Sequence, residues 1–247
     1  MPDAAGVGLR NILEASRRCV VFTGAGISTE SGIPDYRSPG GIWSRYQPIE
    51  FDAFLASEEA RRDYWQRKFD THETIVQAQP NEGHLAIAEL QRRGKVAVVI
   101  TQNVDGLHLT CAPREDSVIE LHGNTTYATC LACAKRYELE PIRRRFLADG
   151  SLPVCEACGA LVKTATISFG QPMPKAALER AERHARACDL FLAIGTSLRV
   201  RPAADLPVLA KRNGARLVIA NREPTALDGI ADLVLHAEIG PTLQSAL

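Results

Sequence analysis

Short, almost continuous apolar runs recur along the chain. They occupy residues 19–23, 96–100, 190–194, 217–220 and 233–235. A short apolar run bounded by glycine or polar residues is typical of a strand that is buried on both faces. The pattern therefore predicts a set of buried parallel strands.

Segments with helical character lie between several of these runs. Asn81 is a suitable cap for a helix that stops at Gly94, and residues 174–187 are rich in Ala, Leu, Glu and Arg. Pro202 can open a further helix that ends near Gly214. Alternating strands and helices predict an α/β fold, with a Rossmann-like parallel sheet covered by helices on both faces.

Two segments interrupt this alternation. Residues 34–48 contain Gly, Pro, Tyr and Trp without a clear period, and they predict a long loop that serves as a lid or binding segment. Residues 125–163 hold four paired cysteines and predict a small inserted zinc-binding domain. The Rossmann-like domain is then formed by 1–124 and 164–247, with part of the 34–80 region packed beside the insertion.

Charge and composition narrow the function classes. Lys plus Arg and Asp plus Glu both number 29, so no net positive charge attracts nucleic acid and no direct nucleic-acid binding is expected. No apolar stretch approaches the ~20 residues of a membrane helix, and the N-terminus lacks the order of a signal peptide. These features predict a cytoplasmic protein with no membrane partner.

Four of the seven cysteines are paired at short spacing, as Cys130-x-x-Cys133 and, after 21 further residues (134–154), Cys155-x-x-Cys158. Four thiolates on two such turns can form a tetrahedron around zinc, and a closed shell leaves no position for a reactive water. The spacing predicts a structural zinc. The remaining cysteines are expected to be buried thiols without a further role: Cys19, Cys111 and Cys188.

Polar residues follow several of the predicted strands. Gly24-Ala25-Gly26-Ile27-Ser28 follows the first and should begin a helix, where backbone amides could bind a pyrophosphate, although Thr29 stands where the dinucleotide fingerprint has its third glycine. A plain tight turn explains this segment equally well. The other clusters are Thr101-Gln102-Asn103-Val104-Asp105-Gly106, Gly195-Thr196-Ser197 and Asn221. Together they favour a nucleotide crevice at the carboxyl ends of the strands.

His122 follows the short β-rich run 117–121. A histidine with an ordinary pKa is a plausible general base at neutral pH, although a lone histidine is more often a hydrogen-bonded structural residue. A polar turn also remains an alternative for residues 101–106, because Asn and Asp commonly satisfy turn backbones.

From about Cys19 to Asn221 the sequence resembles the sirtuin family. The resemblance rests on blocks in the same order: Gly24-Ala25-Gly26-Ile27-Ser28, Gly32-Ile33-Pro34-Asp35-Tyr36-Arg37, Thr101-Gln102-Asn103-Val104-Asp105-Gly106-Leu107-His108, His122-Gly123, the four paired cysteines, Phe169-Gly170 and Gly195-Thr196-Ser197-Leu198. It departs from the commonest pattern at three places: Tyr36, Cys111-Ala112-Pro113 and Gln171.

The resemblance implies an NAD-dependent protein lysine deacylase that releases nicotinamide and O-acyl-ADP-ribose, with NAD as co-substrate and acylated lysine side chains as partners. It implies that His122 and Asn103 are catalytic, with His122 as the base. The residues it assigns to the NAD and nicotinamide sites are Gly24, Ala25, Gly26, Ser28, Ile33, Asp35, Tyr36, Arg37, Gln102, Asn103, Asp105, His122, Gly195, Thr196, Ser197 and Asn221. A protein mono-ADP-ribosyltransferase that uses the same NAD site is the alternative.

The resemblance also assigns a substrate site. Phe169, Gly170, Leu198 and Val200 would hold the substrate peptide as an added strand. Tyr64 and Arg67 have the Tyr-x-x-Arg spacing of sirtuins that remove succinyl or malonyl groups, and they would share one helical face. The alternative is an amphipathic helix with a solvated arginine, and the neighbouring residues resemble a different sirtuin branch. The sequence therefore names no single acyl group.

Overall fold

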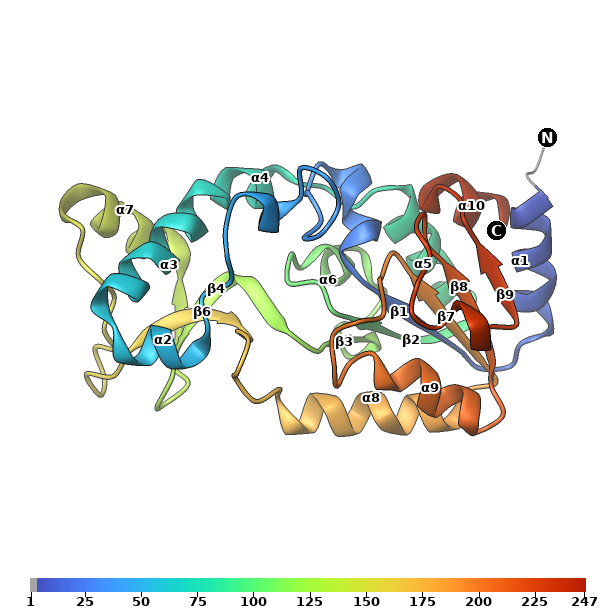
Figure 1. The fold of residues 1–247 in the computed structure, drawn as a ribbon. Helices are drawn as coiled ribbons and strands as arrows, with labels where there is room; N and C mark the ends of the chain where they lie inside the picture. The colour runs from blue at the N-terminus through green and yellow to red at the C-terminus, as the bar shows by residue number, and fades with distance from the viewer. Residues whose placement is uncertain (1–3) are drawn as a thin grey trace.

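The computed structural model describes residues 4–247, which form a large parallel sheet joined to a smaller antiparallel one (Figure 1). The large sheet has the order β3-β2-β1-β7-β8-β9, and every neighbouring pair is parallel. Its strands are β1 (Cys19–Thr23), β2 (Val96–Thr101), β3 (Val118–Glu120), β7 (Leu190–Ile194), β8 (Arg216–Ala220) and β9 (Leu233–Leu235). The strand order reverses between β1 and β7, which is where open α/β sheets bind ligands.

Helices cover both faces of this sheet, as the continuous apolar runs predict. One face carries α1 (Ala4–Ala15), α5 (Glu82–Arg92) and α10 (Ile239–Ser245), and the other carries α8 (Lys175–Ala187) and α9 (Asp205–Arg212). Successive strand residues face opposite sides: Val21 packs in the core with Leu90, whereas Phe22 packs in the core with Ala181. The predicted Rossmann-like α/β fold is confirmed.

The predicted helix boundaries are mostly correct. Asn81 caps α5, since its side-chain oxygen accepts from the amides of Gly83 and His84 at 3.0 and 3.3 Å. The prediction that Pro202 opens a helix is wrong. Residues 201–204 form turns, in which the amide of Asp205 bonds the carbonyl of Pro202 at 3.0 Å, and α9 begins only at Asp205.

The small sheet has the order β5-β4-β6 and is antiparallel. Its strands are β4 (Gly123–Cys130), β5 (Arg136–Glu138) and β6 (Val162–Thr166), and α7 (Leu139–Asp149) follows β5. The helices α2 (Phe51–Ala56), α3 (Glu58–Asp70) and α4 (His72–Gln77) precede α5 and lie at the same end of the molecule (Figure 1).

The core of this part is shared between α3 and the small sheet. Trp65 and Phe69 of α3 pack with Phe146 and Val162, so the cysteine-bearing segment borrows apolar side chains from outside itself. β4 begins two residues before the predicted boundary at 125 and β6 extends past 163. The predicted division into two domains stays a prediction.

The remaining elements are short. They are α6 (Leu107–Cys111) and the 3₁₀ helices η1 (Ala25–Ser31), η2 (Ile42–Ser44), η3 (Glu115–Ser117) and η4 (Asp228–Ile230). The glycine segment after β1 therefore begins a 3₁₀ helix, and the 34–48 segment is a loop with one 3₁₀ turn. None of the helices between residues 4 and 247 combines the length and apolar character needed to cross a bilayer.

Candidate active site

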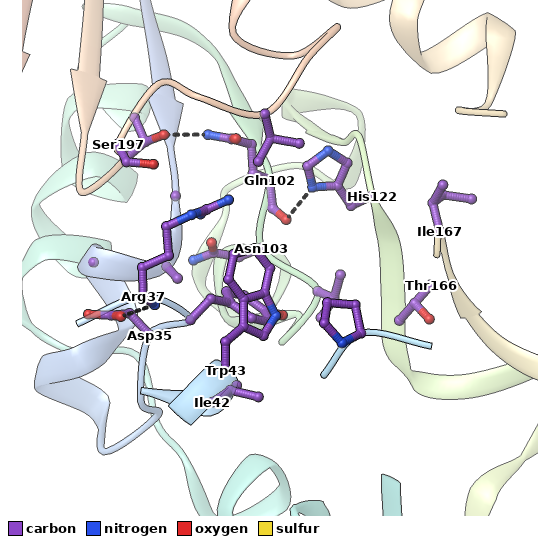
Figure 2. A pocket seen from close by; sticks show the side chains of 18 of the residues that line it. Asp35, Arg37, Ile42, Trp43, Gln102, Asn103, His122, Thr166, Ile167 and Ser197 are labelled. Carbon is purple, nitrogen blue, oxygen red and sulfur yellow. Dashed lines mark hydrogen bonds between the residues drawn. The ribbon is translucent and has the colours of Figure 1, made fainter. Parts of the chain in front are cut away.

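A cavity of about 780 Å³ lies at the carboxyl edge of the large sheet and extends to α3 and the small sheet. The sequence-predicted residues that line it are Gly24, Ala25, Gly26, Asp35, Tyr36, Arg37, Tyr64, Arg67, Gln102, Asn103, His122, Phe169, Gly170, Gly195, Thr196, Ser197, Val200 and Asn221. Segments that are far apart in sequence thus meet in one space. Figure 2 shows part of this cavity.

Four of the predicted residues do not line this cavity. Ser28, Ile33, Asp105 and Leu198 are buried behind its wall, and Asp105 instead faces a second, smaller cavity of about 230 Å³. Their direct contact with a ligand stays a prediction. The structure gives Ser28 and Asp105 a supporting position instead.

Close backbone contact between two loops explains the glycines at the switch point. The Gly26 amide donates to the Gly195 carbonyl at 2.8 Å, and a Cβ on Gly26 would lie 2.8 Å from Gly195 Cα. Gly195 itself has φ +60° and leaves no room for a Cβ, which would lie 2.5 Å from the Ile27 nitrogen. The Gly26 amide is therefore used inside the protein, and the glycines allow the two loops to pack in direct contact.

His122 is oriented by the end of β2. Its Nδ1 lies 3.0 Å from the carbonyl oxygen of Gln102, which can only accept, so Nδ1 carries the ring proton and Nε2 has a free lone pair (Figure 2). Burial lowers the pKa of His122 from 6.5, although the hydrogen bond to Gln102 opposes this shift. The ring is neutral at pH 7 and can accept a proton at Nε2.

Asn103 is held from behind by two buried side chains. Its Nδ2 donates to Ser28 Oγ at 3.0 Å, and the Ser28 hydroxyl donates to Asp105 Oδ2 at 2.7 Å. Asp105 also accepts from the Leu107 amide at 2.9 Å. Burial raises the pKa of Asp105, although these two hydrogen bonds oppose the rise. The Asn103 side chain therefore has a fixed orientation at the cavity wall.

Hydrogen bonds within the 34–48 loop fix its shape where it lines the cavity. Asp35 Oδ1 accepts from the amides of Arg37 and Ser38 at 2.8 Å each, and these bonds lower its pKa although burial opposes the shift. The guanidinium of Arg37 lies 4.2 Å from the centre of the Trp43 ring (Figure 2). The centre of the Trp43 ring is 5.8 Å from that of Phe169. Sequence reasoning identified this loop but did not single out Trp43.

Tyr64 and Arg67 both line the cavity, but their polar groups are engaged. The Tyr64 hydroxyl bonds the hydroxyls of Thr164 and Thr166. The Arg67 guanidinium forms a two-point ion pair with Asp63, one turn earlier on α3. Lys68, the residue after Arg67, is buried and also lines the cavity. Sequence reasoning did not identify it, because no local pattern signals its burial.

The four paired cysteines converge. All four Sγ atoms lie within 4.8 Å of one another, and the Cys130–Cys158 and Cys133–Cys155 distances are 3.5 and 3.6 Å. A tetrahedron with zinc–sulfur bonds of ~2.3 Å has edges of about 3.8 Å, so the geometry fits. Two main-chain amides donate to Cys130 Sγ at 3.4 Å and the Tyr137 hydroxyl donates to Cys155 Sγ at 3.1 Å, as thiolate ligands require.

The fold and the site define a class. A parallel sheet with close-packed glycine loops at its switch point belongs to the dinucleotide-binding α/β proteins, and this example carries an additional four-thiolate module for structural zinc.

Comparison with known proteins identifies the family. A protein-family model described as "Sir2 family" matches residues 24–202. The chain is 57% identical over 235 residues to "NAD-dependent protein deacetylase 1" of Bradyrhizobium diazoefficiens, covering 95% of this chain and 92% of that protein. It is 55% identical to "NAD-dependent protein deacetylase" of Rhodopseudomonas palustris, with 95% and 93% covered. A solved structure described as "Sir2-p53 peptide-NAD+" superimposes with a TM-score of 0.85 at 34% identity, with 95% and 93% covered. The chain belongs to the Sir2 family.

Proposed function

We propose that this protein is an NAD-dependent protein-lysine deacylase, which transfers the acyl group of an acyl-lysine side chain to ADP-ribose and releases nicotinamide. The observation that carries the proposal is the tautomer of His122, whose Nε2 is free to accept a proton in the same cavity as the glycine loops. The two bacterial relatives, described as NAD-dependent protein deacetylases, support it.

The glycine loops and strand ends would hold NAD. Bound NAD supplies the glycosidic bond to nicotinamide and the ADP-ribose that accepts the acyl group. Gly24, Gly26 and Gly195 allow the two loops at this edge to pack in direct contact, and the Gln102 side-chain amide, which donates to the Thr196 hydroxyl at 2.8 Å, fixes the adjoining wall. Asn221 at the end of β8 lines the far end of the same cavity.

His122 and Asn103 would act on the reacting atoms. His122 accepts a proton at Nε2 from a hydroxyl brought into the cavity, and burial keeps the ring neutral until it does so. Asn103, fixed by Ser28, orients a polar group of the ligand rather than moving with it. A carboxamide oxygen is a poor nucleophile, so positioning and exclusion of water must supply much of the rate.

The acyl-lysine peptide would enter between the Phe169-Gly170 and Leu198–Val200 segments. Phe169 is exposed, and its carbonyl already accepts from the Phe51 amide at 2.8 Å, which fixes this segment against α2. Main-chain pairing of this kind gives affinity with modest sequence preference. The absence of nucleic-acid and membrane partners and a cytoplasmic location stay predictions from the sequence.

Mass spectrometry of acyl-lysine peptides tests the proposal. Acetyl-lysine peptide is incubated with the protein, with and without NAD, beside His122→Ala and a control, His184→Ala, which lies on α8 away from the cavity. We expect NAD-dependent loss of the acyl group with O-acyl-ADP-ribose as a product. His122→Ala should lower the rate ~100-fold or more, and His184→Ala should retain it.

Two results would contradict the proposal. Deacylation that survives in His122→Ala would remove the histidine from the chemistry. Cleavage of NAD with ADP-ribose attached to protein, and no acyl group lost from any peptide, would favour the mono-ADP-ribosyltransferase alternative.

A further inference from the structure

Three buried polar side chains meet at the carboxyl ends of β1 and β2. Thr23 and Thr101 are the last residues of these strands and lie side by side in the sheet, and His108 belongs to α6. All three are buried, and none of them lines either of the two cavities described above. A buried polar group is costly unless it is hydrogen-bonded, so the bonds that these side chains make need an explanation.

Three hydrogen bonds join His108 to the main chain of Asn103. His108 Nε2 lies 3.0 Å from Thr23 Oγ1. The Thr23 hydroxyl donates to Thr101 Oγ1 at 2.9 Å, and the Asn103 amide donates to the same oxygen at 3.0 Å. His108, Thr23 and Thr101 thus form a continuous connection, here called the His108 chain, that ends at a residue of the cavity wall.

The direction of each hydrogen bond in the His108 chain follows from its donors. The Asn103 amide can only donate, so the Thr101 oxygen accepts from it and from Thr23. The single hydroxyl proton of Thr23 is used in that bond, so its oxygen accepts from His108, whose ring carries its proton at Nε2. Burial lowers the pKa of His108 well below 6.5, and the nearby His84 adds to this effect, so the ring is neutral at pH 7.

Asn103 is also held through its side chain, and this second support leads back to the same helix. Its Nδ2 donates to Ser28 Oγ, and the Ser28 hydroxyl donates to Asp105. Asp105 accepts from the first main-chain amide of α6, one residue before His108. The start of α6 therefore holds Asn103 from two directions, by its side chain through Ser28 and by its main chain through the His108 chain.

The two threonines also contact the segments that carry the proposed base. The Gln102 amide donates to the Thr23 carbonyl at 2.9 Å, and the Gln102 carbonyl accepts from His122. The Leu121 amide, directly before His122, donates to the Thr101 carbonyl at 2.9 Å. A shift of either threonine would therefore move both residues that are assigned to the reaction.

We propose that His108 is a positioning residue for deacylation, and that it acts on Asn103 through the hydroxyls of Thr23 and Thr101. The inference rests on the proposed deacylase function and adds a residue that lies outside the cavity. Without the His108 donor the Thr23 oxygen is left with a buried, unpaired acceptor position, and the hold on Asn103 loosens. A displacement of ~1 Å at a reacting group can lower a rate about 100-fold.

Steady-state kinetics with an acetyl-lysine peptide and NAD test the proposal. His108→Leu removes the donor and keeps an apolar side chain of similar size, whereas His108→Gln keeps an amide that can donate from near the position of Nε2. We expect kcat to fall ~10- to 100-fold in His108→Leu. The KM values should change less than about 3-fold, because contacts made equally in the ground and transition states remain. His108→Gln should recover most of the lost kcat.

A stability control separates positioning from a general loss of structure. Leu13→Ala in α1 removes a buried core side chain that does not line the cavity. It should lower the free energy of unfolding and leave kcat unchanged at a temperature where the protein is folded. The stability of each variant is measured by denaturant unfolding. If kcat falls no further in His108→Leu than in Leu13→Ala, the proposal is wrong.

A double-mutant cycle on kcat tests the route. Thr23→Val removes the connecting hydroxyl with almost no change of shape, so it breaks the His108 chain even where His108→Leu does not fold. If the chain acts as a unit, His108→Leu adds little in the Thr23→Val background, and the two effects are not additive. Additive effects, or a Thr23→Val variant with the wild-type kcat, would overturn the proposal.

The remaining outcomes separate this inference from the deacylase function itself. If the wild-type protein removes no acetyl group, the proposed function fails and the inference falls with it. If the wild-type protein is active and the His108 and Thr23 variants keep its kcat, the function stands and the positioning role is wrong. A loss in His108→Leu that His108→Gln does not recover would assign the effect to ring packing against His84, whose ring centre lies 4.7 Å away, and not to the donated hydrogen bond.

Discussion

The ring of His122 donates from Nδ1 to the main-chain carbonyl of Gln102 at 3.0 Å. The same Gln102 donates from its side chain to the Thr196 hydroxyl at 2.8 Å, at the end of β7. Gln102, which directly follows β2, thus orients the proposed base and joins it to the loop that faces the glycine segment. The base and the dinucleotide-binding edge are positioned together.

The pH dependence of catalysis should follow His122. Burial lowers the pKa of His122 from 6.5. The ring can accept a proton only when it is neutral, so kcat/KM should fall as the pH decreases through this lowered pKa. A rate profile between pH 5 and 8 measures this limb. An acidic inflection clearly above 6.5 would mean that a different group is titrating.

A methyl group at Gly26 should weaken NAD binding. The Cβ would lie 2.8 Å from Gly195 Cα and 2.9 Å from its carbonyl oxygen, so the two loops must separate. At a cost of ~1–3 kcal/mol for overpacking, Gly26→Ala should raise the NAD Kd about 10- to 100-fold in calorimetric titration. Gly8→Ala in α1 is the control, because an added Cβ there meets no atom of another described segment within 4 Å. Equal affinity in Gly26→Ala would refute the close-contact argument.

Removal of the Ser28 hydroxyl should affect both stability and rate. The hydroxyl connects Asp105 and Asn103, so Ser28→Ala leaves one hydrogen bond missing from each. We expect a loss of ~1–3 kcal/mol in the free energy of unfolding, measured with denaturant. Kcat should fall as well, because Asn103 loses its support.

A double-mutant cycle with Asp105→Asn provides the control for Ser28. If the two residues interact as the geometry indicates, the effects of the single variants will not add, with a coupling of ~0.5–3 kcal/mol. Simple additivity would show that the loss in Ser28→Ala comes from elsewhere.

Removal of zinc should unfold the small sheet and expose Trp65. This ring is 1% exposed and packs in one cluster with Cys130, Cys155 and Phe146. The chain has two tryptophans, so in a Trp43→Phe variant all tryptophan fluorescence comes from Trp65. A strong chelator should shift its fluorescence to longer wavelength and abolish activity, because structural zinc contributes folding free energy.

The zinc content of cysteine variants checks the ligand assignment. Cys130→Ser should bind less than one zinc per chain, whereas Cys111→Ser, at a half-buried thiol of α6, should retain one. Full zinc content in Cys130→Ser with a native fluorescence spectrum would contradict the four-thiolate site.

Stability should fall in mild acid because of His84. Its side chain is fully buried, its Nε2 has no hydrogen-bond partner among residues 4–247, and burial lowers its pKa from 6.5 to about 4. Between these values the unfolded chain binds a proton that the folded chain does not, so the free energy of unfolding should decrease as pH falls from 6.5 toward 4. The slope is at most ~1.4 kcal/mol per pH unit, or about 3 kcal/mol in all.

Comparison of two variants isolates this effect. His84→Gln should reduce the pH dependence of the unfolding free energy over that interval. Leu85→Gln, at the next residue of α5, whose side chain is 48% exposed and carries no titratable group, is the control and should leave it nearly unchanged. An unaltered slope in His84→Gln would assign the acid sensitivity to other groups.

The sequence by itself determined the framework of this protein. Apolar runs located β1, β2, β7, β8 and β9 within about one residue, because a strand buried on both faces needs apolar residues at nearly every position. Paired cysteines indicated the zinc module, because chelation fixes ligand type and spacing. The residues alone made His122 a plausible base, but only the family resemblance assigned it that role, since a single histidine has no pattern of its own.

Only the tertiary structure decided which side chains reach the cavity and which charges are free. Ser28 and Asp105 belong to motif segments, yet they lie behind the wall, because burial depends on segments that are distant in sequence. Arg67 is paired with Asp63, whereas the next residue, Lys68, is buried on a helix whose Trp65 and Phe69 pack against the small sheet. Local pattern specifies the elements, but contacts between elements decide burial, pKa and access, and these quantities determine the chemistry.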